Sequence, residues 1–213
     1  MRLAAALLAL AGAAGTAGTA VADRYEATVG LTLHGGAARL PEVGAATATV
    51  PAFGAAVRVT HAWRDPLAWD LQVGGTLTQP ATYAGVMRTV SGRPQVGDIS
   101  RRTVTGAALV GAELRLGYRW IPTVRLGLGP QVRHRSASNL GIFPDAVPAE
   151  TSVDAVASLS LGLDVRLGAH RLMGVMLQVE HGQPLGDAPA CDVVGVSLRL
   201  SHAWYPRWWA PDW

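Results

Sequence analysis

Aliphatic and polar residues alternate over long stretches of this chain. In residues 157–168, ASLSLGLDVRLG, every second position is aliphatic, and the positions between carry Ser, Gly, Asp or Arg. A period of two is typical of a β-strand, because successive side chains point to opposite faces. The sequence therefore predicts an all-β protein. Its eight segments of this kind lie at about 24–34, 53–64, 68–79, 102–120, 123–135, 152–168, 171–182 and 192–205.

The connections between these segments alternate in length. Long stretches rich in Gly and Pro follow the odd-numbered segments, at about 35–52, 80–101, 136–151 and 183–191. Tight turns follow the second, fourth and sixth segments, at 65–67, 121–122 and 168–171. Long loops at one end and short turns at the other are typical of an eight-stranded antiparallel up-and-down transmembrane β-barrel.

Aromatic residues gather at the short-turn ends of the predicted strands. Tyr and Trp favour the membrane–water interface, where the ring meets lipid and the polar atom meets water. A soluble core would not sort its aromatic residues to one rim, so the pattern predicts a periplasmic girdle. Its members are Tyr25, Trp63, Trp69, Tyr118, Trp120, Trp204 and Tyr205.

The size of the barrel decides which face of each strand points outward. A soluble barrel would enclose its apolar face, but eight strands leave a lumen only wide enough for side chains. The polar face is mainly Gly, Ser and Thr with single charges and no lysine, which suits a narrow interior better than a water-exposed surface. Acids and arginines are nearly balanced there, so we expect a paired network that plugs the lumen. The predicted lumen charges are Glu26, Arg58, Asp70, Glu113, Arg115, Arg125, Arg133, Asp154, Asp164, Arg166, Glu180 and Arg199.

The N-terminus has the composition of a secretory signal peptide. Arg2 precedes the apolar run LAAALLALAGAA, and Ala20-Val21-Ala22 forms an A-x-A cleavage site. The apolar run is too short to span a bilayer as a helix. We therefore expect a signal peptide over 1–22, a barrel over 23–205 and an aromatic periplasmic tail over 206–213.

Charge and cysteine content exclude several functions. The formal net charge is +3, but the arginines are scattered singly along the strands, so the basic stripe of a nucleic-acid-binding protein is missing. The single cysteine, Cys191, allows no internal disulfide. The histidines have no metal-ligand spacing, and the chain has no phosphate-binding or dinucleotide-binding fingerprint, so we expect neither a metal nor a cofactor.

The predicted mature chain resembles the eight-stranded outer-membrane β-barrels of Gram-negative bacteria, of the OmpA and OmpX kind. The resemblance rests on the signal peptide, the eight segments, the loop asymmetry and the aromatic residues, and on no specific motif. It implies an outer-membrane location with both termini periplasmic. It also implies a monomer that contacts outer-membrane lipid and lipopolysaccharide, and insertion by the barrel-assembly machinery. Members of the family usually end on an aromatic residue of the last strand, whereas here a tail follows Tyr205.

Four arginines of the second long loop are candidate ligands for lipopolysaccharide phosphates, because guanidinium groups bind phosphate well. They are Arg88, Arg93, Arg101 and Arg102. A plain solvated loop is the explanation that we favour for them, and lipopolysaccharide contact is the alternative.

A weak candidate for catalysis lies at the outer end of the fifth segment, in RHRSASNLGI. His134 and Ser136 share the lipid face, and a serine needs a nearby base to act as a nucleophile. The pair loosely resembles the His-x-Ser element of outer-membrane lipid A deacylases, although Ala137 and Ser138 separate the serine from Asn139. Glu150 is the only suggestion for an orienting acid.

The sequence thus favours a non-enzymatic barrel with a structural or surface-interaction role, exerted through its extracellular loops. Passage of small or apolar solutes through the barrel is one alternative, although porin-like channels take about 16–18 strands. A lipid A-modifying hydrolase is the other.

Overall fold

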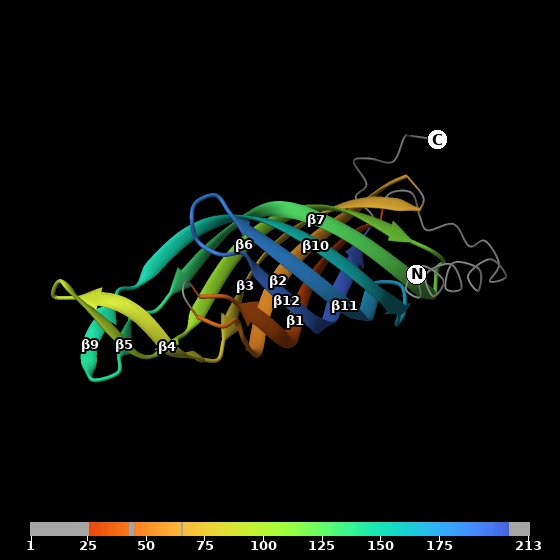
Figure 1. Cartoon of the computed structure of the whole chain (residues 1–213). Helices are drawn as coiled ribbons and strands as arrows, with labels where there is room; N and C mark the ends of the chain where they lie inside the picture. Colours follow the sequence, from red (N-terminus) through yellow and green to blue (C-terminus); the bar gives the residue numbers. More distant parts are fainter. Residues whose placement is uncertain (1–25, 43–44, 65, 205–213) are drawn as a thin grey trace, which may run out of the picture.

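A computed structural model describes residues 26–42, 45–64 and 66–204. The predicted signal peptide, the tail and two girdle residues, Tyr25 and Tyr205, lie outside these ranges. Eight antiparallel strands close a barrel in the order β1-β12-β11-β10-β7-β6-β3-β2 (Figure 1). These strands are β1 (Ala27–Leu40), β2 (Ala48–Arg64), β3 (Leu67–Thr78), β6 (Thr103–Arg115), β7 (Trp120–Arg135), β10 (Glu150–Arg166), β11 (Arg171–Pro184) and β12 (Cys191–Trp204).

The eight predicted segments correspond to the eight barrel strands, so the predicted fold class is confirmed. The predicted turn at 121–122 is wrong, because β7 already begins at Trp120 and residues 116–119 connect it to β6. The first long loop is shorter than predicted. The pairing of β1 with β2 continues to Leu40 and Ala48, because Ala37 and Arg39 keep the alternation going beyond Gly36. The first strand therefore extends to Leu40, beyond its predicted end at about residue 34.

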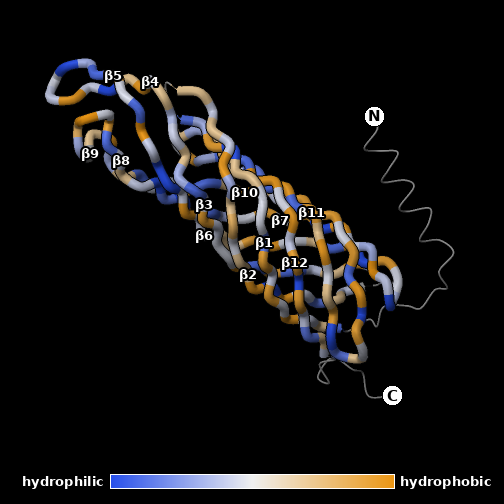
Figure 2. Tube along the Cα trace, turned by 90° about the horizontal axis from the view of Figure 1, so that it is seen from below, coloured by the Kyte–Doolittle hydropathy of each residue, from blue (hydrophilic) through white to orange (hydrophobic). Residues whose placement is uncertain are grey.

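Two of the predicted long connections contain β-hairpins, which the sequence analysis did not predict. The second loop folds into β4 (Ala81–Val90) and β5 (Arg93–Arg101), and the third contains β8 (Ser138–Leu140) and β9 (Phe143–Val147). Ser91 and Gly92 connect β4 to β5, both with positive φ, as the favoured two-residue hairpin turns require. Both hairpins lie beyond the same end of the barrel (Figures 1 and 2).

The outer face of the barrel is apolar and the inner face is polar. Alternate residues of β7 show the division, since Leu126 and Leu128 are 61% and 67% exposed while Arg125 is 1% exposed. Figure 2 shows that hydrophobic and hydrophilic residues alternate along the barrel strands. An apolar surface that surrounds a whole barrel cannot face water. The barrel therefore spans a membrane, and its closed sheet leaves no strand edge unpaired in lipid.

No helix in the described part of the chain is long and apolar enough to cross a membrane. The girdle residues within that part are all exposed and lie at the end of the barrel with the short turns. They are Trp63, Trp69, Tyr118, Trp120 and Trp204.

Apolar side chains form a cluster near each end of the barrel. Ile121, Leu172 and Ala203 pack together at the short-turn end. A larger cluster lies at the hairpin end, where Tyr83 and Ile99 of the first hairpin and Leu140 and Val147 of the second pack on the barrel rim. The hairpins are thus fastened to the mouth of the barrel.

Candidate functional site

Ion pairs fill the middle of the lumen. Asp70 accepts two hydrogen bonds from Arg125, at 2.7 and 2.8 Å, and a third from Arg58 at 2.9 Å. Arg58 also pairs with Glu113, and Arg199 lies 3.4 Å from the same carboxylate. All five side chains are at most 4% exposed. Buried charges of this kind remain ionised only because each has opposite charges in contact.

The network continues toward both ends of the barrel. On the short-turn side, Glu26 pairs with Arg115 and Arg166. Asp164 pairs with Arg199 and accepts a hydrogen bond from Thr123 at 3.2 Å. On the hairpin side, Arg133 lies 3.1 Å from Asp154. Glu180 is half-buried and accepts a hydrogen bond from Gln178.

The structure places all twelve predicted lumen charges inside the barrel, and six of them are arginines and six are acids. Because these charges balance, the lumen has no net charge that would attract ions. A cavity near the hairpin end has a volume of only about 10 Å³, and its walls include Thr76, Thr78, Thr103 and Thr105. This volume fits about one water molecule.

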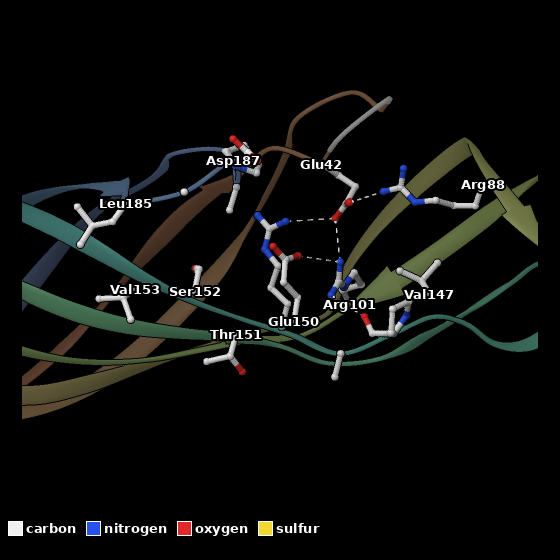
Figure 3. A pocket seen from close by; sticks show the side chains of 16 residues that line it. Glu42, Arg88, Arg101, Val147, Glu150, Thr151, Ser152, Val153, Leu185 and Asp187 are labelled. Carbon is white, nitrogen blue, oxygen red and sulfur yellow. Dashed lines mark hydrogen bonds and ion pairs between the residues drawn. The ribbon is translucent and has the colours of Figure 1, made fainter.

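A second cluster of charges lies above the lumen, at the hairpin-end mouth of the barrel. Glu42, directly after β1, is buried and accepts hydrogen bonds from three arginines. Its Oε1 atom lies 2.9 Å from Arg88, while its Oε2 atom lies 3.4 Å from Arg101 and 3.3 Å from Arg135 (Figure 3). We call these four residues the mouth cluster. It ties the loop after β1 to the first hairpin and to the end of β7.

Further hydrogen bonds hold the mouth cluster in place. Arg101 donates to the carbonyl oxygens of Ser136 and Pro148, at 3.0 and 3.2 Å, and Arg135 donates to that of Pro41 at 2.9 Å. Glu150 lies 3.6 Å from Arg101 and is 43% exposed. The cluster therefore has a rigid inner side and a solvent-facing outer side.

The outer side of the mouth cluster faces a pocket of about 690 Å³ (Figure 3). One wall is the chain from Val147 to Val153, and the opposite wall runs from Leu185 to Pro189, between β11 and β12. Arg88 is the most accessible of the three arginines, with 29% of its side chain exposed, whereas Arg101 and Arg135 are each 4% exposed.

A buried tyrosine connects the apolar cluster beneath the hairpins to the end of β1. The Tyr83 hydroxyl donates a hydrogen bond to the carbonyl oxygen of Leu40 at 3.1 Å. Burial raises the pKa of this phenol above its usual value, with Glu42 acting in the same direction and Arg135 against it. The hydroxyl therefore stays protonated and keeps donating at physiological pH.

The four predicted lipopolysaccharide ligands differ in their surroundings. Arg93 and Arg102 are exposed, Arg88 is partly exposed, and Arg101 is buried beneath Glu42. Arg101 is therefore the one of the four that is buried among protein groups, and its role as a lipopolysaccharide ligand stays a prediction. Sequence reasoning missed Glu42 and Arg135, although Arg135 has the inward parity of Arg133.

The weak catalytic candidates do not form a nucleophile–base pair. His134 is exposed, and its Nδ1 atom lies 3.0 Å from the Thr151 hydroxyl. The Ser136 hydroxyl instead accepts a hydrogen bond from the backbone amide of Arg102 at 3.0 Å. Glu150, the suggested orienting acid, pairs with Arg101. Each of the three side chains therefore serves a local structural contact.

No family model matches the chain, and no curated protein matches it in sequence. Among solved structures, it is similar to Ail, the attachment invasion locus protein of Yersinia pestis, with a TM-score of 0.48 and 10% identity over 85% of this chain and 99% of Ail. It is also similar to Neisserial surface protein A, with a TM-score of 0.44 and 10% identity over 82% and 96% of the two chains. For the outer membrane protein OprG of Pseudomonas aeruginosa, the TM-score is 0.43 and the identity 12% over 85% and 96%.

Sequence identities of 10–12% give no correspondence between individual residues. The properties of this chain therefore follow from its own closed sheet, apolar outer face and charged lumen. These features make it an eight-stranded transmembrane β-barrel with the architecture of the outer-membrane type.

Proposed function

We propose that this protein is a non-enzymatic outer-membrane barrel that acts at the cell surface through its extracellular hairpins. The observation that carries the proposal is the contrast between a lumen filled with ion pairs and two ordered hairpins beyond its mouth. A plugged barrel has little capacity for transport, whereas projecting loops on a rigid scaffold are the usual place for binding.

The hairpins have the properties of a binding platform. Met87 and Val96 are cross-strand partners of β4 and β5, and they are 62% and 63% exposed. Ile142, between β8 and β9, is 89% exposed. The two hairpins are joined through a hydrogen bond of 2.9 Å from the Ser100 amide to the Ser138 hydroxyl. Apolar side chains on a rigid, water-exposed element favour contact with a partner.

The rest of the proposal concerns the setting of the barrel. The hairpins are extracellular and both termini are periplasmic, after removal of a signal peptide over 1–22. The barrel is a monomer inserted by the barrel-assembly machinery, and lipid and lipopolysaccharide surround it. The girdle at the short-turn end supports this orientation, since short turns face the periplasm in such barrels.

Replacing each hairpin by a tight turn tests the proposal. Heat-modifiable gel mobility and outer-membrane fractionation should report a folded barrel in the variant. Attachment of cells to immobilised glycans and matrix proteins should fall to the level of cells lacking the protein. Unchanged attachment by the variant would contradict the proposal.

Solute passage, the second candidate, is tested by planar-bilayer recordings of the refolded wild-type protein. We expect no current, because the lumen charges are paired and the described cavity holds about one water. Discrete current steps, together with unchanged cell attachment by the variant that lacks the hairpins, would favour solute passage.

A further inference from the structure

The mouth cluster has more positive charge than its carboxylate can satisfy. A carboxylate has two oxygens, and here one of them serves both Arg101 and Arg135, at 3.4 and 3.3 Å, while the other serves Arg88. Charge-assisted N–H···O contacts are usually about 2.7–2.9 Å long. The two contacts to the shared oxygen are therefore long, and three guanidinium groups surround one monovalent acid. Glu150 lies near only one of these groups and is partly exposed.

The cluster also has room for a ligand. The pocket of about 690 Å³ borders all three arginines, and Arg88 reaches it with a partly exposed side chain that has Glu42 as its ion-pair partner. The pocket walls also include Thr151 and Ser152, but the Thr151 hydroxyl bonds to His134 and the Ser152 hydroxyl bonds to Arg133 and Asp154, so the arginines are the main polar groups for a ligand. A ligand could enter from outside without passing through the barrel.

We propose that the three arginines form a binding site for a phosphate group, and that Glu42 occupies this site in the unliganded protein. A phosphate monoester has three non-bridging oxygens, so each guanidinium can have its own acceptor, and guanidinium forks match phosphate geometry. The ligand displaces the Glu42 side chain and takes over its contacts. The inference deepens the proposed surface function, on which it rests, by assigning the ligand chemistry of the mouth.

The other acids of the pocket limit what binds. Glu150 is 43% exposed, and Asp187 on the opposite wall is exposed. Their charges would repel a polyanion, because they add negative potential over the entrance to the arginines. The site therefore suits one phosphate group on a neutral or zwitterionic carrier, rather than a densely sulfated or phosphorylated polymer.

Three substitutions in the full-length protein, refolded in detergent micelles, test the proposal by titration with inorganic phosphate. Glu42→Gln removes the competing charge and keeps the shape of the side chain, so it should tighten the Kd by about tenfold or more, the value of one charged hydrogen bond. Arg88→Gln should weaken binding by about tenfold in both the wild-type and the Glu42→Gln background. Arg93→Gln, a matched loss of charge on the same hairpin, should change nothing.

The source of the phosphate group is distinguished by a second titration, with bicelles that contain a phosphate-bearing glycolipid before and after phosphatase treatment. Stronger binding to the phosphorylated bicelles than to inorganic phosphate assigns a lipid-linked ligand, and the reverse assigns free phosphate. The proposed site is contradicted if Glu42→Gln leaves the Kd for phosphate unchanged. It is also contradicted if Glu42→Gln raises this Kd while heat-modifiable gel mobility shows a folded barrel. Such a result leaves the hairpin attachment test unaffected, so the two proposals fail separately.

Discussion

The lumen and the mouth of this barrel both consist of arginines around carboxylates, but they differ in balance and in access. In the lumen, Asp70 receives three short contacts, is fully buried, and belongs to a set of six acids and six arginines. At the mouth, Glu42 serves three arginines beside an open pocket, and the contacts on its shared oxygen are longer. The comparison separates charge that fills space from charge that is available to a ligand.

The difference follows from the surroundings of each cluster. Side chains from eight strands converge in a lumen surrounded by lipid, where an unpaired charge is very costly, so the charges must be equal in number. The mouth borders water, which tolerates a surplus of positive charge. A surplus of positive charge beside a cavity therefore supports the proposed phosphate site, whereas a balanced internal network is expected of any plugged barrel.

The sharpest test of the comparison is Asp70→Asn. It leaves Arg58 and Arg125 without their shared carboxylate in a site closed to water, and removing one partner of a buried pair costs about 3–5 kcal/mol. We expect the free energy of unfolding in phospholipid vesicles to fall by about that amount. Glu150→Gln, which removes a 43% exposed acid at the mouth, is the matched control and should lie within about 0.5 kcal/mol of the wild type. Similar losses of unfolding free energy in both variants would contradict the proposed difference between the lumen and the mouth.

The second test compares apolar residues that are exposed in the two regions. Leu128, at the middle of β7, is 67% exposed and faces lipid, and Ile142 is 89% exposed between β8 and β9. Leu128→Arg should destabilise the barrel by about 2–4 kcal/mol, because a cation near the bilayer midplane is costly. Ile142→Arg should leave the free energy of unfolding unchanged, since it faces water. Both are measured by denaturant titration in vesicles, and a large effect of Ile142→Arg would place that hairpin in contact with lipid.

The barrel could be predicted from the sequence because its physical cause is periodic. Alternation assigns Asp164 and Arg166 to one face and Leu163 and Val165 to the other, and the same rule holds in every barrel strand. The first hairpin does not show this strict alternation, because its register shifts between Tyr83 and Val86. The bulge interrupts the alternation of β4, so a segment with strand structure has the sequence pattern of a loop.

The mouth cluster could not be predicted, because it forms between residues far apart in the chain. Glu42 lies 46 residues from Arg88 and 93 from Arg135, and no periodic pattern relates a loop residue to a partner on another loop. The parity of Arg135, two residues after the predicted lumen residue Arg133, would have placed it inside the mouth. Its partner still depends on how the loop after β1 folds over the rim.

A third prediction concerns the stability of the mouth itself. In phosphate-free buffer, Glu42→Gln should lower the free energy of unfolding by about 1–3 kcal/mol, because it leaves charged groups without their acceptor. This loss is smaller than that for Asp70→Asn, since water reaches Arg88. Added phosphate should raise the thermal midpoint of Glu42→Gln by more than that of Asp70→Asn, because the Glu42 carboxylate still competes for the site in Asp70→Asn. Equal increases in both variants would indicate a general salt effect instead.

The smallest expected effect is local to the junction between hairpin and barrel. Tyr83→Phe removes the hydrogen bond to the Leu40 carbonyl, worth about 1 kcal/mol, and keeps the ring in the apolar cluster. Hydrogen exchange should quicken in β4 and β5 but not in the barrel strands. In the wild type, the raised pKa of Tyr83 means that the folded state disfavours the phenolate, so the junction is stable below about pH 10 and loosens as the pH rises above it. Tyr83→Phe should lack this alkaline loosening, and its persistence in the variant would assign the effect to another group.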